Sequence, residues 1–369
     1  MPSPDVLVVG GGMVGCAVAR ELAAAGLSVT VLERGEPGAG ASRAAAGMLS
    51  PLAESHGTGP FLDLLRAASA RFPALVAGLA AETGVDPGYR AEGTLFAALS
   101  DGDERELELR LGWQGPAGLP VERLGRDELL RLEPALSPEV RWGLSYPEDH
   151  QVDSVRLFRA LLVSAQGRGA RLEPGTEVAG VVVENGSARG VRLATGEVRA
   201  AGVVVVAAGC WSGRLVGLPR PLPVRPVHGQ LLSLQASPSL LTRVVDSPRC
   251  YLVPRRDRVI AGTTVEETGF RAAVTPAGIS AILAGAVELL PAAAGLPIQR
   301  LWSGLRPGTP DKLPVLGPDP EVKGLLYATG HFRNGVLLAP ITGEVVRDLL
   351  LEGVWPDCDL APFRADRFG

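Results

Sequence analysis

Three glycines near the start of the chain have the spacing of a phosphate-binding turn. Gly10, Gly12 and Gly15 follow an apolar run at 6–9 and precede a segment with apolar residues at helical spacing. Gly10 would let the chain turn sharply, Gly12 would let a pyrophosphate approach the backbone, and Gly15 would let the helix pack closely on the strand. The helix N-terminus would add free N–H groups and a partial positive charge. The pattern therefore predicts a dinucleotide site.

An acidic residue lies where the second strand of such a unit should end. Glu33 closes the apolar run 29–32, about 20 residues after the glycines. Its carboxylate can accept hydrogen bonds from both ribose hydroxyls and would repel the 2′-phosphate of NADP, so the pattern favours FAD or NAD. An ordinary βαβ unit with a glycine-rich turn is the alternative. It is disfavoured because the strand, the helix and the acid all occur where the motif requires them.

An arginine near the end of the chain could bind a carboxylate. Arg306 follows the largely apolar run 301–305. Burying an unpaired guanidinium is costly, so the side chain needs an anion, and its planar fork suits a carboxylate held by two hydrogen bonds. The alternative is a structural ion pair with an acid such as Asp311.

Length and composition indicate a globular protein of about two domains. The chain has 369 residues, of which 46% are hydrophobic and 21% charged, with a net charge of −4. This mild charge gives no sign of a nucleic-acid surface or a polybasic membrane anchor. No basic segment precedes the first apolar run, and the run at 200–208 is too short for a membrane span. We therefore expect a cytoplasmic protein.

The four cysteines predict neither a metal site nor a disulfide framework. They stand at 16, 210, 250 and 358, and no pair has the spacing of metal ligands. Cys16 and Cys210 lie in apolar surroundings beside glycine turns, which favours core packing.

Periodicity predicts alternating helices and strands along the whole chain. Helices are expected over 61–79, 104–111, 126–132, 155–166, 275–290 and 337–352. Strands are expected over 89–98, 178–183, 190–193, 198–200, 203–208, 227–234, 249–254, 258–264, 301–308 and 324–329. The fully apolar strand at 203–208, closed by Gly209, suits a parallel sheet covered on both faces, whereas the alternating strands after 227 suggest an antiparallel platform.

The small residues at 42–49 leave two interpretations open. They would allow a flat group to lie against the backbone, or they could begin an alanine-rich helix with Ser42 as its N-cap.

Six segments in this order resemble the D-amino-acid oxidase superfamily of FAD-dependent oxidoreductases, and within it the glycine oxidases of thiamine biosynthesis. They are the glycine turn with Glu33, and the segments 42–49, 203–209, 250–255, 304–311 and 330–335. The resemblance covers essentially the whole chain. It implies an α/β plus α+β fold, with a Rossmann-like FAD-binding domain and a second, mainly antiparallel substrate domain. The expected boundaries are 1–86, 147–222 and 305–369 for the first domain, and 87–146 and 223–304 for the second.

The resemblance implies a non-covalently bound FAD. Sarcosine oxidases of the superfamily attach their flavin through a cysteine just before the segment that matches 309–311, and residues 304–308 contain no cysteine here. The expected cofactor contacts are Gly10, Gly12, Met13, Val14, Gly15, Glu33, Arg34, Ala41, Ser42, Ala46, Gly47, Met48, Val178, Gly209, His331, Phe332, Arg333, Asn334, Gly335, Val336 and Leu337.

The resemblance also implies roles for three side chains at the substrate. Arg306 would anchor the substrate carboxylate, and Tyr251 would donate its hydroxyl to the same group. Arg333 would form part of the pocket wall or entrance. Packing at a domain boundary is the alternative for Tyr251, and a plain surface arginine is the alternative for Arg333. His331 is not assigned as a base.

The implied reaction is oxidative deamination of glycine or another small amino acid, giving an oxo acid, ammonia and hydrogen peroxide. The amino acid and molecular oxygen are then the reaction partners, and a homo-oligomer is possible. Two alternatives stay open: a D-amino-acid or imino-acid dehydrogenase with another electron acceptor, and a flavin-binding subunit without turnover.

Overall fold

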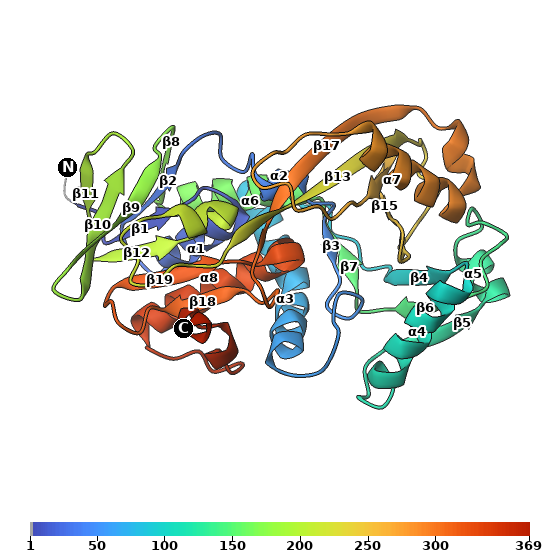
Figure 1. Cartoon of the computed structure of the whole chain (residues 1–369), viewed down its shortest axis with the longest axis horizontal. Helices are drawn as coiled ribbons and strands as arrows, with labels where there is room; N and C mark the ends of the chain where they lie inside the picture. Colours follow the sequence, from blue (N-terminus) through green and yellow to red (C-terminus); the bar gives the residue numbers. More distant parts are fainter. Residues whose placement is uncertain (1–2) are drawn as a thin grey trace.

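The computed structural model describes residues 3–369 and contains two large sheets joined by long strands (Figure 1). The first sheet has six strands in the order β18-β19-β12-β1-β2-β8, all parallel except the edge strand β18. Its strands are β1 (Val6–Val9), β2 (Val29–Glu33), β8 (Arg171–Pro174), β12 (Val203–Val206), β18 (Val315–Pro318) and β19 (Leu325–Thr329).

The two faces of this sheet pack against different layers because side chains alternate along each strand. Val6 and Val8 of β1 face helices, whereas Leu7 and Val9 face a small antiparallel sheet. The helices of this part are α1 (Met13–Ala24), α3 (Pro60–Thr83), α6 (Ser154–Gly167) and α8 (Gly335–Leu351), and the small sheet contains β9 (Val178–Glu184), β10 (Ser187–Leu193) and β11 (Val198–Ala200).

The second large sheet has eight strands in the order β17-β13-β16-β15-β14-β4-β6-β5. Every neighbouring pair is antiparallel except β14 and β4. The strands are β4 (Thr94–Ala98), β5 (Glu122–Gly125), β6 (Trp142–Tyr146), β13 (Arg225–Gln235), β14 (Val244–Asp246), β15 (Tyr251–Pro254), β16 (Arg258–Gly262) and β17 (Ile298–Gly308).

Helix α7 (Pro276–Leu289) covers one face of the second sheet through Ile279, Ile282 and Ala286. Figure 1 shows α4 (Asp101–Gln114) and α5 (Arg126–Leu132) at the β4–β6 end. The remaining elements are short: α2 (Ala41–Ala44), β3 (Met48–Leu49), β7 (His150–Gln151), η1 (Gly209–Arg214), η2 (Pro291–Gly295), η3 (Phe332–Asn334), η4 (Ala361–Phe363) and η5 (Ala365–Phe368).

The fold class expected from the sequence is confirmed, as are all six predicted helices to within a few residues. Local signals explain this accuracy: the Asp153 carboxylate caps α6 by accepting from two backbone N–H groups, and Thr275 caps α7, which begins at Pro276. Cys16 and Cys210 are buried, as predicted, and burial raises the pKa of each thiol to about 12.

Several strand boundaries differ from the prediction. The strand expected over 89–98 begins at Thr94, after Gly93 in the left-handed region at φ 87°. The strands expected over 203–208, 249–254 and 258–264 are β12, β15 and β16, which are shorter. The short strands β3, β5, β7, β8, β14 and β18 were not predicted at all.

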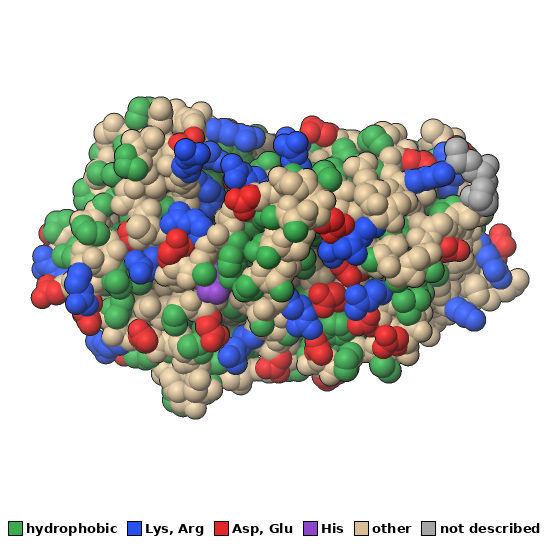
Figure 2. All heavy atoms as spheres, turned by 180° about the vertical axis from the view of Figure 1, so that it is seen from behind, with side chains coloured by type: hydrophobic (Ala, Val, Ile, Leu, Met, Phe, Trp, Pro, Cys, Tyr) green, Lys and Arg blue, Asp and Glu red, His purple; other side chains and the backbone are tan. Residues whose placement is uncertain are grey.

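The proposed domain boundaries stay a prediction, and residues 1–2 of the first segment lie outside the described residues. Strand β17 crosses the boundary placed at 304/305. By length and composition, α3 is the single helix within 3–369 that could cross a membrane. Its side chains Leu64, Leu65 and Phe72 are buried in the core. On the face shown in Figure 2, acidic and basic side chains are interspersed.

Candidate active site

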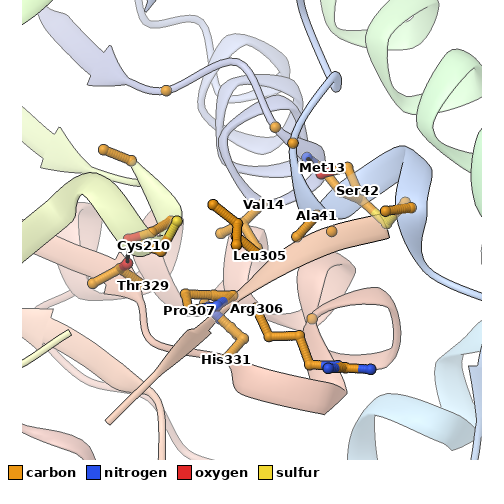
Figure 3. A pocket seen from close by; sticks show the side chains of 18 of the residues that line it. Met13, Val14, Ala41, Ser42, Cys210, Leu305, Arg306, Pro307, Thr329 and His331 are labelled. Carbon is orange, nitrogen blue, oxygen red and sulfur yellow. Dashed lines mark hydrogen bonds between the residues drawn. The ribbon is translucent and has the colours of Figure 1, made fainter. Parts of the chain in front are cut away.

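One cavity of about 700 Å³ extends from the β1–α1 turn to the strands β13, β15 and β17 of the second sheet (Figure 3). Its lining contains nearly all the residues predicted to contact a cofactor. The exceptions are Gly15 and Leu337. Leu337 is buried in the hydrophobic core and so is placed away from the cavity wall. Tyr251, Arg306 and Arg333 line the same cavity.

The β1–α1 turn has the close packing that the glycines were expected to allow. Gly10 lies at φ 112°, and a Cβ there would come 2.5 Å from the carbonyl oxygen of Ala207. A Cβ at Gly15 would come 1.9 Å from the carbonyl oxygen of Gly10. Gly15 therefore sets the distance between helix and strand without lining the cavity. Gly12 is the N-cap of α1 and has no side chain to occupy the helix N-terminus.

The carboxylate of Glu33 is held in place at the end of β2. It accepts hydrogen bonds from the backbone N–H groups of Gly11 and Gly35, at 2.8 and 2.9 Å. A carboxylate has about four lone-pair sites, so it retains acceptor capacity for ribose hydroxyls. The sequence predicted the ribose contact but not these backbone partners.

Residues 41–48 form one wall of the cavity. The N-cap of α2 is Gly40, so the interpretation of Ser42 as an N-cap is wrong. The Ser42 hydroxyl instead accepts a hydrogen bond from the Met13 N–H at 2.8 Å, which ties this wall to the glycine turn. The indole of Trp302 donates to the carbonyl oxygen of Ala44 at 3.0 Å and fixes the wall to β17.

The opposite wall contains the N-terminus of α8. Gly335 and Val336 line the cavity, and the first N–H groups of a helix have no partner within the helix. His331 is buried and hydrogen-bonds the Thr342 hydroxyl at 2.9 Å. Burial lowers the pKa of His331 to about 3, so the imidazole is neutral, and its buried contact with Thr342 gives it a packing role.

Arg306 has only uncharged partners. It donates to the Thr263 hydroxyl at 2.8 Å and to the Thr264 carbonyl at 3.3 Å, and within residues 3–369 no carboxylate lies at ion-pair distance from it. Asp311 pairs with Arg367 at 2.7 Å instead, so the alternative of an Arg306–Asp311 ion pair is wrong.

Glycines make room for both side chains proposed at the substrate. A Cβ at Gly229 would come 2.2 Å from Nη1 of Arg306, and a Cβ at Gly262 would come 2.7 Å from the Tyr251 hydroxyl. The Thr263 hydroxyl accepts a hydrogen bond from Arg306 at 2.8 Å. Burial raises the pKa of Tyr251 to about 12, so its hydroxyl stays protonated and can donate.

Arg333 lines the cavity and is at the same time exposed. Its guanidinium donates to the carboxylate of Glu54 at 2.6 Å, and the Glu54 charge raises the pKa of Arg333. Glu54 also lines the cavity and was not predicted. Its sequence neighbourhood carries no motif, and the ion pair joins residues 279 positions apart.

An aromatic stack that the sequence did not predict lies at the nucleotide end of the cavity. The guanidinium of Arg34 lies 3.6 Å from the ring centre of Trp211, which packs on Phe270 at 5.6 Å. Arg214 lies 4.0 Å from the ring centre of Phe270. Arg34 and Trp211 line the cavity.

A family model described as FAD dependent oxidoreductase matches residues 5–349 of this sequence. The chain belongs to this family. The "Glycine oxidase" of Geobacillus kaustophilus is 38% identical over 98% of this chain and 97% of its own length. The crystal structure of glycine oxidase from the same organism has a TM-score of 0.93 at 36% identity, and the match covers 98% of each chain.

A third relative is longer than this chain. The "Bifunctional protein ThiO/ThiG" of Nostoc sp. is 39% identical over 94% of this chain, which covers 53% of that protein. The chain thus spans about half the length of these bifunctional relatives.

The cavity fits the FAD that the family uses. Gly12 lines the cavity, and a Cβ there would lie 3.2 Å from the Ser42 hydroxyl, so its lack of a side chain leaves room for a pyrophosphate at the helix N-terminus. The Ser50 hydroxyl is buried, lines the cavity and has no partner within residues 3–369, so it is available to a ligand. The cysteine-free segment 304–308 forms part of β17, which agrees with non-covalent attachment.

Proposed function

We propose that this flavoprotein oxidatively deaminates glycine or another small amino acid. The reaction converts the amino acid, water and oxygen into the oxo acid, ammonia and hydrogen peroxide. One observation carries the proposal: Arg306, a cation with only uncharged partners, lies with Tyr251 in the same cavity as the dinucleotide turn. The Arg306 guanidinium and the Tyr251 hydroxyl are both hydrogen-bond donors, and the carboxylate of an amino acid is an anion that can accept from both.

The bound FAD supplies the two-electron acceptor for the Cα–H hydrogen. Arg306 binds the substrate carboxylate with its guanidinium fork, and the protonated Tyr251 hydroxyl donates a further hydrogen bond to it. These two contacts fix the orientation of the Cα–H bond. The Thr263 hydroxyl accepts a hydrogen bond from Arg306 and so helps to hold the guanidinium in place.

No protein base is needed in this scheme when the substrate amine enters in its neutral form. His331 lines the cavity in its neutral form, but it is buried and hydrogen-bonded to Thr342, which favours a packing role. The N–H groups at the start of α8 line the cavity and would offer a positive electrostatic environment to the bound cofactor. The imine product then hydrolyses to the oxo acid and ammonia.

The relatives support the oxidase and a role in the thiazole branch of thiamine biosynthesis, since their names are glycine oxidase and ThiO/ThiG. They give no support to the dehydrogenase or to a subunit without turnover. We keep a two-domain division, a cytoplasmic location and a homo-oligomer as predictions.

An amine screen tests the proposal. The purified protein is mixed with glycine, sarcosine, D-alanine and D-proline, first without oxygen to follow bleaching of the flavin and then in air to measure hydrogen peroxide. We expect bleaching and stoichiometric peroxide with glycine or another small amino acid. Absence of peroxide with every amine would refute the oxidase, and absence of bleaching would refute amine oxidation altogether.

A further inference from the structure

Two arginines lie at the substrate end of the cavity, and they differ in their partners. Arg306 contacts a hydroxyl and a carbonyl group at 2.8 and 3.3 Å. Arg333 is paired with the carboxylate of Glu54 at 2.6 Å. All three side chains line the cavity. One cation is therefore free for an incoming anion, and the other is already neutralised by the protein.

Glu54 is held firmly rather than carried on a loose loop. Residues 51–54 form a turn, and the fully buried carboxylate of Asp149 accepts from two backbone N–H groups just before Glu54, at 3.0 and 2.8 Å. Arg110 and Gln114 of α4 donate to carbonyl groups of the same turn, at 2.5 and 3.1 Å. The backbone of Glu54 is therefore already ordered. Forming the ion pair with Arg333 then costs little conformational entropy.

A second acid lies near the pair. Asp246 is buried at the end of β14, and its charge, like that of Glu54, acts on Arg333. Burial, followed by repulsion from Glu54, raises the pKa of Asp246 to about 7. Two acids, Glu54 and Asp246, thus act on Arg333, whereas within residues 3–369 no carboxylate lies at ion-pair distance from Arg306.

We propose that Glu54 sets the substrate class of this site. By occupying Arg333, it leaves Arg306 as the one free carboxylate anchor and excludes amines that carry a second carboxylate. The inference rests on the proposed function, because it assumes that Arg306 binds the substrate carboxylate. A second carboxylate in the cavity would meet the negative charge of Glu54, and breaking the Glu54–Arg333 pair would leave a charge in the cavity without its partner.

The test compares acetate with malonate, which differ by one carboxylate, as ligands of the flavin-loaded enzyme. Binding is measured by the change in flavin absorption, so no turnover is required. In Glu54→Gln and Glu54→Ala we expect the malonate-to-acetate affinity ratio to rise by about tenfold to a hundredfold, the worth of one charge-assisted hydrogen bond. Glu108→Gln makes the same change in net charge at an exposed ion pair on α4 and should leave the ratio unchanged.

Arg333→Met supplies the second half of the test. Combined with Glu54→Gln it should abolish the gain in malonate affinity, because the gain comes from the released Arg333. Alone, it leaves the Glu54 carboxylate unpaired in the cavity, so the ratio should stay at or below that of the unsubstituted enzyme. An unchanged ratio in flavin-loaded Glu54 variants, a gain that survives Arg333→Met, or a higher ratio in Arg333→Met alone would each overturn the inference.

Substrate turnover separates this inference from the proposed function. The unsubstituted enzyme should oxidise glycine and reject iminodiacetate, and Glu54→Gln should gain activity on iminodiacetate. If the unsubstituted enzyme oxidises no amine, the proposed function fails whatever the ligand titrations show. If it oxidises glycine and iminodiacetate equally well, only the inference about Glu54 fails.

Discussion

Replacement of Arg306 by lysine keeps the positive charge but removes the planar fork. A lysine ammonium cannot form two parallel hydrogen bonds to one carboxylate, so about one charge-assisted bond is lost. Such a bond contributes about 1.5–3 kcal/mol. We therefore expect Arg306→Lys to lower kcat/KM for glycine by about tenfold to 150-fold. Since Arg306 has no acid partner within residues 3–369, the loss reports on the substrate and not on a broken ion pair.

The assay measures kcat/KM by peroxide formation, alongside the bound flavin per chain. Flavin content should stay unchanged, because the glycine turn that would bind the cofactor phosphates, with Gly10 and Gly12, lies at the other end of the cavity from Arg306. Arg300→Lys is the matched control, since Arg300 lies exposed on the same strand and outside the cavity lining. Unchanged kinetics in Arg306→Lys would refute the carboxylate anchor, and a parallel loss of flavin would assign Arg306 to the fold or the cofactor site.

Three further predictions follow from the geometry. Gly229→Ala places a Cβ 2.2 Å from the Arg306 guanidinium and should raise KM for glycine about tenfold or more with flavin retained; an unchanged KM would contradict the close fit. Gly12→Leu should abolish flavin retention, which absorbance after gel filtration measures, and acid precipitation of the unsubstituted protein should release its flavin into the supernatant. Burial depresses the pKa of His331 to about 3, so its neutral form stabilises the fold above the unfolded pKa near 6.5, and this stability is lost as the pH falls toward 3. When the pH falls from 6.5 to 5, the unfolding free energy measured in urea should drop by about 2 kcal/mol less in His331→Gln than in the unsubstituted chain. Equal drops in the two proteins would contradict this role of His331.

The sequence predicted the parts of this protein that depend on local signals. A few neighbouring residues are enough to recognise the glycine turn and the acid that ends β2. The same is true of the capped helices α6 and α7. The apolar run before Arg306 indicated a carboxylate-binding arginine, and the resemblance added Tyr251 and Arg333; all three side chains line one cavity.

Contacts between distant segments could not be predicted. Glu54 meets Arg333 across 279 positions, and the space that Gly229 leaves for Arg306 depends on the pairing of β13 with β17. Short strands such as β14, with three residues, are set by their neighbours in the sheet rather than by their own periodicity. Ser42 shows the same limit, since its hydroxyl has the right chemistry for a helix cap but serves a different helix.

Anaerobic addition of glycine to the purified flavoprotein tests the central claim most directly. The account predicts that glycine, or another small amino acid carrying one carboxylate, bleaches the flavin, and that Arg306→Ala slows this bleaching while retaining the cofactor. A flavin that stays oxidised with every amino acid tried, or that is reduced equally fast in Arg306→Ala, would contradict the account.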